Sequence, residues 1–269
     1  SPGSKGNDRM ATHSELQSLR SLKTGKGRRE WNQYAAEGVR LLEESTRHGV
    51  DPEVLYCDPG ALSDRGRQLA EELRGRGVRY EEIAAHQLEN AADTKTPQGL
   101  IGVFKCPEIS LGSLQTCRRL LVCDGISDPG NVGTLIRSAH AFDFEAVLLT
   151  DESADPFSPK VVRSTAGSIF AIPAVKTSLE DCLGFLAESP FSLVTSDPAA
   201  AQDTALLTGE ARSKQLALAI GSEGKGISPS LLERSSLRLA IRHSDQVESL
   251  NAGVAGSLLM REIYELPSD

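Results

Sequence analysis

The second half of the chain alternates short, fully apolar runs with stretches of helical spacing. Residues 120–123 and 146–150 are apolar runs of the kind that forms buried parallel strands. Between them, residues 132–141 have the spacing of a helix, and Pro129 and Gly130 predict a tight turn at its entrance. The pattern predicts a strand–turn–helix–strand unit, with the turn at the carboxyl end of a strand, where open parallel sheets bind ligands.

The same alternation continues to the C-terminus and predicts a parallel α/β domain over residues 117–269. Strands are predicted at 169–175, 192–196, 216–220 and 237–241, and helices at 160–165, 179–188, 229–234 and 250–265.

A smaller α/β domain is predicted over residues 16–105, after a flexible leader at 1–15 and before a polar linker at 106–116. Its predicted helices are 15–22, 34–48, 61–76 and 84–92, and its predicted strands are 54–57 and 100–104. Gly25 and Gly27 predict a loop within the basic stretch at 20–29.

Composition places this 269-residue chain among ordinary globular proteins, with 39% hydrophobic and 25% charged residues. No apolar run approaches the length of a transmembrane helix, and the first ten residues lack the apolar segment of a secretory signal. We therefore expect a cytoplasmic protein with no membrane partner. The five cysteines and five histidines are scattered, which predicts reduced, mostly buried thiols and no metal site.

A formal net charge of −8 argues against binding nucleic acid through overall charge. Residues 20–29 nevertheless hold five cations and no carboxylate. Two interpretations stay open for this stretch: a solvated basic segment, or a local footprint for phosphates. The candidate phosphate contacts are Lys23, Lys26, Arg28 and Arg29.

Two further motifs lie late in the chain. Residues 221–226, GSEGKG, follow an apolar strand, but they have neither the P-loop order nor the G-x-G-x-x-G order of dinucleotide-binding folds, so an oxidoreductase of that type is excluded. What remains is a glycine-rich loop that can bring backbone amides close to a flat ligand. In VESLNAGVAGSLL, from Val247, Ser249 can be the N-cap of the last helix with Asn251 in its first turn.

Taken together, three segments resemble the motifs of the SpoU (TrmH-like) RNA ribose methyltransferases of the SPOUT class. They are DPGNVGTLIR at 128–137, IGSEGKGIS at 220–228 and ESLNAGVAGSLL at 248–259. Residues 158–170 resemble the segment that these enzymes carry between their first two motifs. LKTGKGRREWNQYAAEGVRLLEE and TKTPQGLIGVF resemble the ribosomal-protein-like substrate-binding domain found in many members, so the resemblance covers about residues 16–265.

The resemblance implies an α/β fold whose C-terminal SPOUT domain ends in a deep trefoil knot. It also implies S-adenosylmethionine as cofactor and a homodimer with the final helix at the interface. The implied cofactor-binding residues are Thr195, Ser196, Ile220, Gly221, Ser222, Gly224, Gly226, Ile241, His243, Ser249, Leu250 and Ala252.

By resemblance, Arg137 is the principal catalytic residue and Asn131 lies beside it. Glu223 and Ser249 would orient the site or the cofactor, and Asn251 would support the substrate or the neighbouring loop. Arginine normally stays protonated and is therefore a poor general base. Gripping a phosphate and stabilising a developing alkoxide is the physically easier role for Arg137, and both roles stay open.

The resemblance implies ribosomal RNA as substrate, because transfer-RNA members typically lack the N-terminal module. By analogy with the family, the target lies in large-subunit (23S-type) RNA. Two alternatives remain: a transfer-RNA ribose methyltransferase, and a non-catalytic RNA-binding or ribosome-assembly factor. The sequence departs from the family at Asp143, usually glycine, at Ala252, often valine, and at residues 241–243, where Ile-Arg-His replaces Ile-Pro-Met. The catalytic candidates remain, so we expect activity.

Overall fold

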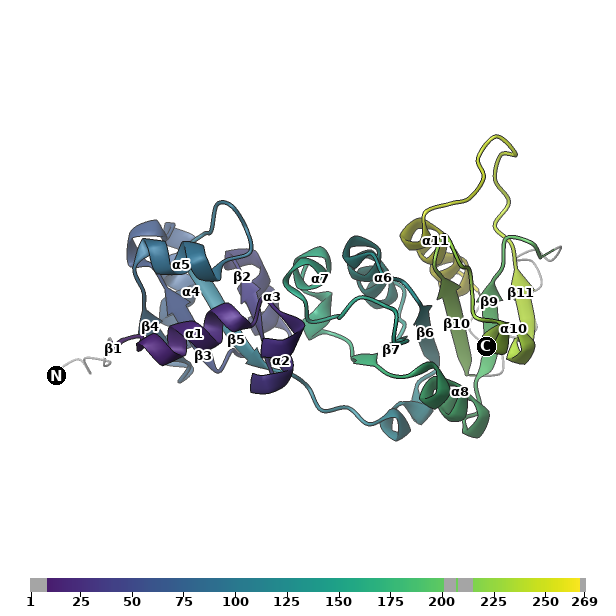
Figure 1. Cartoon of the computed structure of the whole chain (residues 1–269), viewed down its shortest axis with the longest axis horizontal. Coiled ribbons are helices and arrows are strands. Elements are labelled where there is room, and N and C mark those ends of the chain that lie inside the picture. Colours follow the sequence, from purple (N-terminus) through teal and green to yellow (C-terminus); the bar gives the residue numbers. More distant parts are fainter. Residues whose placement is uncertain (1–8, 201–206, 208–214, 267–269) are drawn as a thin grey trace. The chain divides into compact units, whose positions relative to one another are not determined.

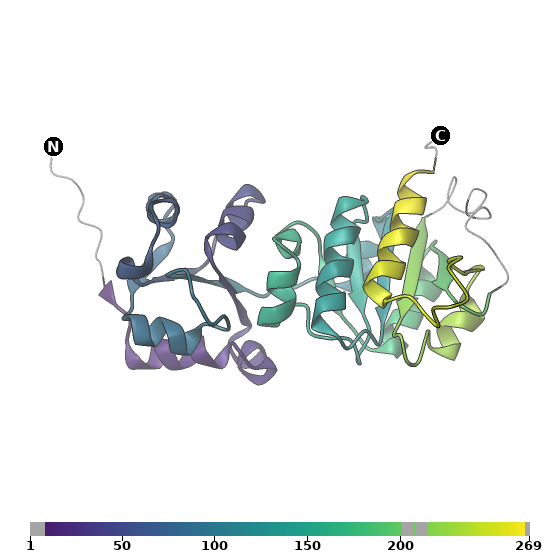
Figure 2. The ribbon, with the colours of Figure 1, turned by 90° about the horizontal axis from the view of Figure 1, so that it is seen from above.

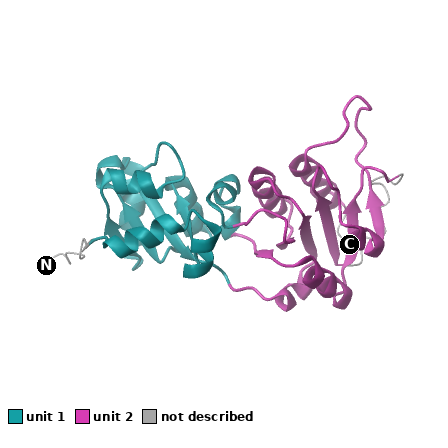
Figure 3. Cartoon of the chain, in the orientation of Figure 1, with its two compact units in different colours: residues 1–107, 157–170 teal, residues 108–156, 171–269 magenta. Residues whose placement is uncertain are grey.

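The computed structural model describes residues 9–200, 207 and 215–266, and the chain divides into two compact units (Figure 3). Unit 1 consists of Ser1–Pro107 together with Phe157–Phe170, and unit 2 consists of Glu108–Pro156 and Ala171–Asp269. Packing therefore assigns Phe157–Phe170 to the first unit, although the sequence pattern placed this segment in the second domain. Of the predicted leader, residues 1–8 lie outside the described residues, whereas Arg9–Met10 form a strand.

Unit 1 is built on a mixed five-stranded sheet of order β1-β4-β3-β5-β2 (Figure 1). Strands β1, β4 and β3 run parallel, and β5 pairs antiparallel with both β3 and β2. The strands are β1 (Arg9–Met10), β2 (Gln33–Glu37), β3 (Val54–Cys57), β4 (Arg79–Glu82) and β5 (Leu100–Lys105). The helices around them are α1 (His13–Ser21), α2 (Gly25–Trp31), α3 (Val39–Arg47), the short η1 (Pro59–Ala61), α4 (Asp64–Gly75) and α5 (Ala85–Ala91).

Two predictions for unit 1 are wrong. Residues 34–48 are not one helix, because β2 occupies 33–37 and Gly38, with a φ of 97°, turns the chain into α3. The basic stretch is not a loop throughout, because Thr24 caps a helix that begins at Gly25 and its side chain accepts a hydrogen bond from Gly27 N at 3.1 Å.

The segment Phe157–Phe170 joins unit 1 through aromatic packing. Phe157 lies 4.7 Å from Tyr34 between ring centroids, and Phe170 lies 5.0 Å from Phe104. This segment holds α7 (Pro159–Ser164) and η3 (Ser168–Phe170), so the strand predicted from residue 169 is wrong; the next strand, β8 (Ala174–Lys176), belongs to unit 2.

Unit 2 is a parallel six-stranded sheet of order β11-β9-β10-β6-β7-β8. Its remaining strands are β6 (Arg119–Asp124), β7 (Ala146–Leu149), β9 (Ser192–Ser196), β10 (Leu216–Gly221) and β11 (Leu237–Leu239). Its helices are η2 (Leu111–Thr116), inside the predicted linker, α6 (Pro129–Ala141), α8 (Leu179–Glu188), α10 (Pro229–Arg234) and α11 (Ala252–Tyr264). The predicted α/β class with a parallel second sheet is confirmed, and the knot stays a prediction.

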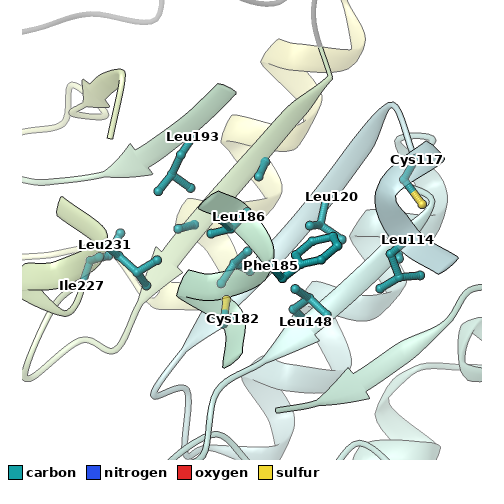
Figure 4. Close-up of a cluster of buried hydrophobic side chains, with 14 residues drawn as sticks. Leu114, Cys117, Leu120, Leu148, Cys182, Phe185, Leu186, Leu193, Ile227 and Leu231 are labelled. Atoms are coloured by element: carbon teal, nitrogen blue, oxygen red, sulfur yellow. The ribbon is translucent and has the colours of Figure 1, made fainter. Parts of the chain in front are cut away.

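Helices cover both faces of this sheet. On one face α6 and α11 lie side by side (Figure 2). On the other, α8 contributes Phe185 to an apolar cluster that includes Leu120 of β6 and Leu148 of β7 (Figure 4). Burial in this cluster raises the pKa of Cys182 to about 12, so its thiol stays protonated at neutral pH. Within the described part of the chain, no helix combines the length and apolarity needed to cross a bilayer.

Candidate functional site

The glycine-rich loop after β10 folds back on itself. A Cβ on Gly221 would lie 2.3 Å from the carbonyl carbon of Gly226, so only glycine fits at this position. Gly226 N donates to Ser222 O at 2.8 Å, and Gly226 has a φ of 67°. The reversal leaves Glu223 near the tip of the loop, with its side chain available to neighbouring elements.

Three distant parts of the sequence meet at the carboxylate of Glu223. Its Oε1 accepts hydrogen bonds from Asn251 Nδ2 at 2.9 Å, from Ala252 N at 3.0 Å and, at 3.4 Å, from Asn131 Nδ2. We call Asn131, Glu223 and Asn251 the acid–amide cluster. One carboxylate therefore connects the first turn of α6, the loop after β10 and the start of α11.

Hydrogen bonds at the starts of α6 and α11 fix the positions of the two asparagines of the cluster. Asp128 is the N-cap of α6, and its Oδ2 accepts from Asn131 N at 2.8 Å. Asn251 is the N-cap of α11, and its Oδ1 accepts from Val254 N at 3.1 Å. The prediction that Ser249 caps the last helix is therefore wrong, because Asn251 takes that position and its amide group is left to reach Glu223.

Small residues let α11 approach α6 and β10 closely. A Cβ on Gly253 would lie 3.2 Å from Asn131 Oδ1, and one on Gly256 would lie 2.3 Å from Leu135 Cδ2. The hydroxyl oxygens of Ser138 and Ser257 are 2.7 Å apart across the same helix pair. This packing holds the capped ends of α6 and α11 together, beside the loop that carries Glu223.

A pocket opens next to the acid–amide cluster. It contains every predicted cofactor-binding residue except Thr195 and Gly224. The hydroxyl of buried Thr195 instead lies 2.9 Å from that of Ser235, and Gly224 lines a neighbouring hollow that it shares with Asn131. The lining residues are Ser196, Pro198, Ile220, Gly221, Ser222, Glu223, Gly226, Ile241, His243, Ser249, Leu250, Ala252 and Ala255.

Sequence reasoning missed Pro198 and Ala255 as lining residues. Ala255 lies one helical turn beyond Ala252, so the helix period pointed to it. Pro198 lies just after β9, beyond the carboxyl end of a strand, where ligand sites of parallel sheets occur.

Two family models match the chain. Residues 118–261 match the SpoU rRNA methylase family, and residues 13–102 match the MRM3-like substrate binding domain. The chain belongs to the SpoU rRNA methylase family.

Similar proteins extend over nearly the whole of this SpoU chain. The 23S rRNA (guanosine(2553)-2′-O)-methyltransferase RlmP of Bacillus subtilis is 32% identical over 93% of this chain and 96% of that protein. The AdoMet-bound rRNA methyltransferase from Sinorhizobium meliloti has a TM-score of 0.82 at 26% identity, covering 95% of both chains. The methyltransferase AviRb from Streptomyces viridochromogenes has a TM-score of 0.81 at 25% identity, covering 94% of this chain and 96% of that one. The predicted family, reaction class and cofactor, an rRNA 2′-O-ribose methyltransferase that uses S-adenosylmethionine, are confirmed.

The pocket of this SpoU chain fits that cofactor. Apolar side chains of Ile220, Leu250 and Ala252 offer a surface for a flat ring, and the backbone at Gly221 comes close because it has no side chain. The ring of His243, where other members usually have methionine, has its Nδ1 2.9 Å from Ile241 O. The lining thus combines apolar contact with a few polar groups, as cofactor pockets do.

Arg137 stands apart from this SpoU pocket. It lies on the exposed face of α6, and neither the pocket nor the neighbouring hollow that contains Asn131 includes it. Its guanidinium has no hydrogen bond or ion pair with any residue that the structure describes. The fold therefore brings Asn131, Glu223, Ser249 and Asn251 together around the pocket and leaves Arg137 free to meet another molecule.

The predicted RNA-binding cations of unit 1 have different surroundings. Lys26 and Arg29 are exposed on α2, and exposed Lys23 donates from Nζ to Asn90 O at 2.8 Å. Arg28 is only 7% exposed, and its guanidinium donates to Leu22 O at 2.8 Å. Arg28 therefore fastens α2 to the end of α1, and we leave it out of the proposed phosphate contacts.

Proposed function

We propose that this protein methylates a ribose 2′-hydroxyl of large-subunit (23S-type) ribosomal RNA in the cytoplasm, where ribosomes lie. The observation that carries the proposal is the acid–amide cluster, which assembles three separated motifs beside the pocket that contains most of the predicted cofactor-binding residues. Two matches support the RNA class: RlmP, which is named for 23S rRNA, and the substrate-binding domain model.

The pocket residues hold S-adenosylmethionine in this proposal. Ile220, Leu250 and Ala252 contact its flat base, and Ser249 and the backbone of residues 221–226 orient its polar groups. The cofactor supplies the electrophilic methyl group, so the protein has to align the acceptor and manage its proton. Glu223 contributes by fixing the asparagine side chains beside the pocket rather than by touching the methyl group.

Arg137 acts on the acceptor in this proposal. As a permanently protonated guanidinium, it grips the phosphate next to the target ribose and stabilises the negative charge that develops on the 2′-oxygen. Its exposure and lack of a partner among the described residues support this role, because an arginine already paired with a carboxylate could not bind phosphate as freely. Asn131, six residues earlier on the same helix, orients the ribose at the edge of the pocket.

A homodimer completes the proposal. The helix α11 leaves Val254 and Leu258 exposed at 48% and 43%, one turn apart on a single face. Two copies of this helix can cover each other's apolar face in an isologous contact. Because α6 packs along α11, the same contact would bring a second subunit close to the helix that carries Arg137.

Transfer of labelled methyl from S-adenosylmethionine tests the proposal. We expect the wild type to label 23S-type rRNA, and Arg137→Ala to lower kcat by about 100- to 1000-fold, the range seen when one donor to an oxyanion is removed. Arg118→Ala, an exposed arginine of unit 2 outside the pocket, serves as the matched control and keeps its activity. Labelling of transfer RNA alone would favour that alternative substrate, and RNA binding without transfer to any RNA would favour an assembly factor.

A further inference from the structure

A second hollow adjoins the cofactor pocket of unit 2. Its volume of about 420 Å³ is in the range of ligand sites. The hollow and the pocket share Ser222 and Glu223, whereas Asn131 lines the hollow and not the pocket. We call it the acceptor hollow, and its lining also includes Glu152 and Lys225. Because Asn131 orients the acceptor ribose in the proposed function, a nucleotide bound there can place its base in this hollow.

Glu152 enters the acceptor hollow from a turn that buried hydrogen bonds hold in place. Its neighbours Thr150 and Ser153 are only 3% and 2% exposed. Thr150 Oγ1 donates to Asp124 Oδ1 at 3.1 Å, and Ser153 Oγ donates to Cys123 O at 3.0 Å. Glu152 itself is exposed. The turn therefore presents a solvent-accessible carboxylate from a fixed backbone, which lowers the entropy lost on binding.

Lys225, in the glycine-rich loop, pairs with this carboxylate. Its Nζ donates to Glu152 Oε2 at 2.8 Å, and the two side chains are 76% and 67% exposed. The hydrogen bond raises the pKa of Lys225, so its ammonium is a donor at neutral pH. Exposed ion pairs add little to stability, so the fold does not explain this one. Glu152 Oε1 accepts no hydrogen bond from any residue in the described ranges.

The pair offers three hydrogen-bonding positions in order: the donor Lys225 Nζ, then the acceptors Glu152 Oε2 and Oε1. The Watson–Crick edge of guanine has the complementary order, because O6 accepts while N1–H and N2–H donate. Uracil offers acceptor, donor, acceptor, and cytosine offers donor, acceptor, acceptor. Adenine has a single donor beside a single acceptor. Guanine is therefore the one standard RNA base whose edge matches all three positions.

We propose that Glu152 and Lys225 select guanosine as the methyl acceptor. The Glu152 carboxylate accepts hydrogen bonds from guanine N1–H and N2–H, and the Lys225 ammonium donates to O6. Because Nζ and Oε2 are already neighbours, the ion pair can meet the base edge without separating. The inference rests on the proposed function, which places the target ribose at Asn131, and it adds the two residues that choose the base.

The identity of the methylated nucleoside tests this choice. The wild type labels 23S-type rRNA with methyl from S-adenosylmethionine, and the product is digested to nucleosides and separated. We expect the label in 2′-O-methylguanosine. Label in the 2′-O-methyl form of adenosine, cytidine or uridine overturns the inference and leaves the proposed function standing. A wild type that transfers no methyl to any RNA sinks the proposed function, and nucleotide binding then decides about the acceptor hollow.

Inosine monophosphate tests the contact at N2, because inosine is guanosine without that amino group. The full-length protein, saturated with S-adenosylhomocysteine to prevent turnover, is titrated by calorimetry with guanosine monophosphate and with inosine monophosphate. We expect guanosine monophosphate to bind about 5- to 150-fold more tightly, the discrimination that one bidentate contact gives. Equal affinities, or binding of neither nucleotide, overturn the inference.

Variants separate base reading from a structural role. Glu152→Gln keeps the size of the side chain but replaces one acceptor with a donor, so the preference for guanosine over inosine monophosphate should disappear. Lys225→Met removes the contact to O6, which both nucleotides have, so both should bind more weakly with their ratio unchanged. Glu188→Gln, an exposed glutamate on α8 that lines neither the pocket nor the acceptor hollow, is the matched control. A Glu152→Gln protein that keeps the wild-type preference overturns the inference.

Discussion

At the scale of single residues, Glu223 is the side chain that links the motifs around the pocket. The first and third motifs lie at the starts of different helices, α6 and α11, and the Glu223 carboxylate accepts hydrogen bonds from both. A hydrogen bond to a charged acceptor contributes more than a neutral one, and it also fixes direction. Glu223 therefore sets the orientation of Asn131 and Asn251 without having to meet the substrate.

Replacing Glu223 tests that role. Glu223→Ala removes the acceptor for Asn251 Nδ2 and Ala252 N, so we expect weaker cofactor binding and a free energy of unfolding lower by about 1 kcal/mol. Titration calorimetry with S-adenosylmethionine and urea unfolding measure the two effects. Glu223→Gln, which keeps an oxygen acceptor, should lose less of both. Glu188→Ala, an exposed glutamate on α8, should change neither; a loss there equal to that of Glu223→Ala would contradict the specific role.

The sequence predicted which motif residues lie together better than it predicted the contacts that each one makes. Asn131, Glu223 and Asn251 could be predicted together because their motifs are specific, but which asparagine or serine caps α11 depends on backbone dihedrals that no pattern shows. Arg28 looked like its basic neighbours, and only the packing of α2 against α1 shows that it points inward. Asp143, where the family usually has glycine, does have a left-handed φ of 56°, which aspartate tolerates better than most residues.

At the scale of elements, helices and strands with a single clear periodicity were predicted well. Segments in which a strand runs directly into a helix were not. The strand β9 and the helix α8 have the predicted bounds, because their periodicity is unbroken. By contrast, Gln33–Glu37 alternates buried and half-buried residues and is followed at once by the helix α3. The strand and helix periodicities therefore read as one helix over residues 34–48. In the basic stretch, Gly27 signalled a loop although its role is to let two helices touch.

The glycines of two helices give a paired test of close packing. Gly256→Ala places a Cβ against buried Leu135 where α11 meets α6, so we expect a free energy of unfolding lower by about 1–3 kcal/mol. Gly184→Ala in the exposed part of α8 has open space around it, so we expect a gain of about 0.5–1 kcal/mol from helix propensity. Urea unfolding of both variants measures these values. Equal effects at the two positions would show that α11 does not need its close approach to α6.

At the scale of the whole molecule, the segment Phe157–Phe170 shows that position along the chain does not decide which unit a segment packs in. It follows β7 and precedes β8, both in unit 2, yet its aromatic residues pack against Tyr34 and Phe104 of unit 1. Its α7 also carries Arg163, which pairs with Asp93 of unit 1. Hydrophobic periodicity predicts which residues are buried, but it does not show which of two cores receives them.

The exposed face of α11 leads to a prediction about assembly. If two chains associate through this helix, Leu258→Asp places a charge on each side of the contact, because an isologous interface contains every substitution twice. We expect the mass measured by light scattering to fall from dimer to monomer, with the dissociation constant raised at least about tenfold by like-charge repulsion in the contact. The fold should survive, because Leu258 is already 43% exposed in the single chain.

Met10→Asp places the same charge at an exposed apolar position in unit 1 and should leave the mass unchanged. A wild type that is monomeric at working concentration, or a Leu258→Asp protein that stays dimeric, would contradict this contact.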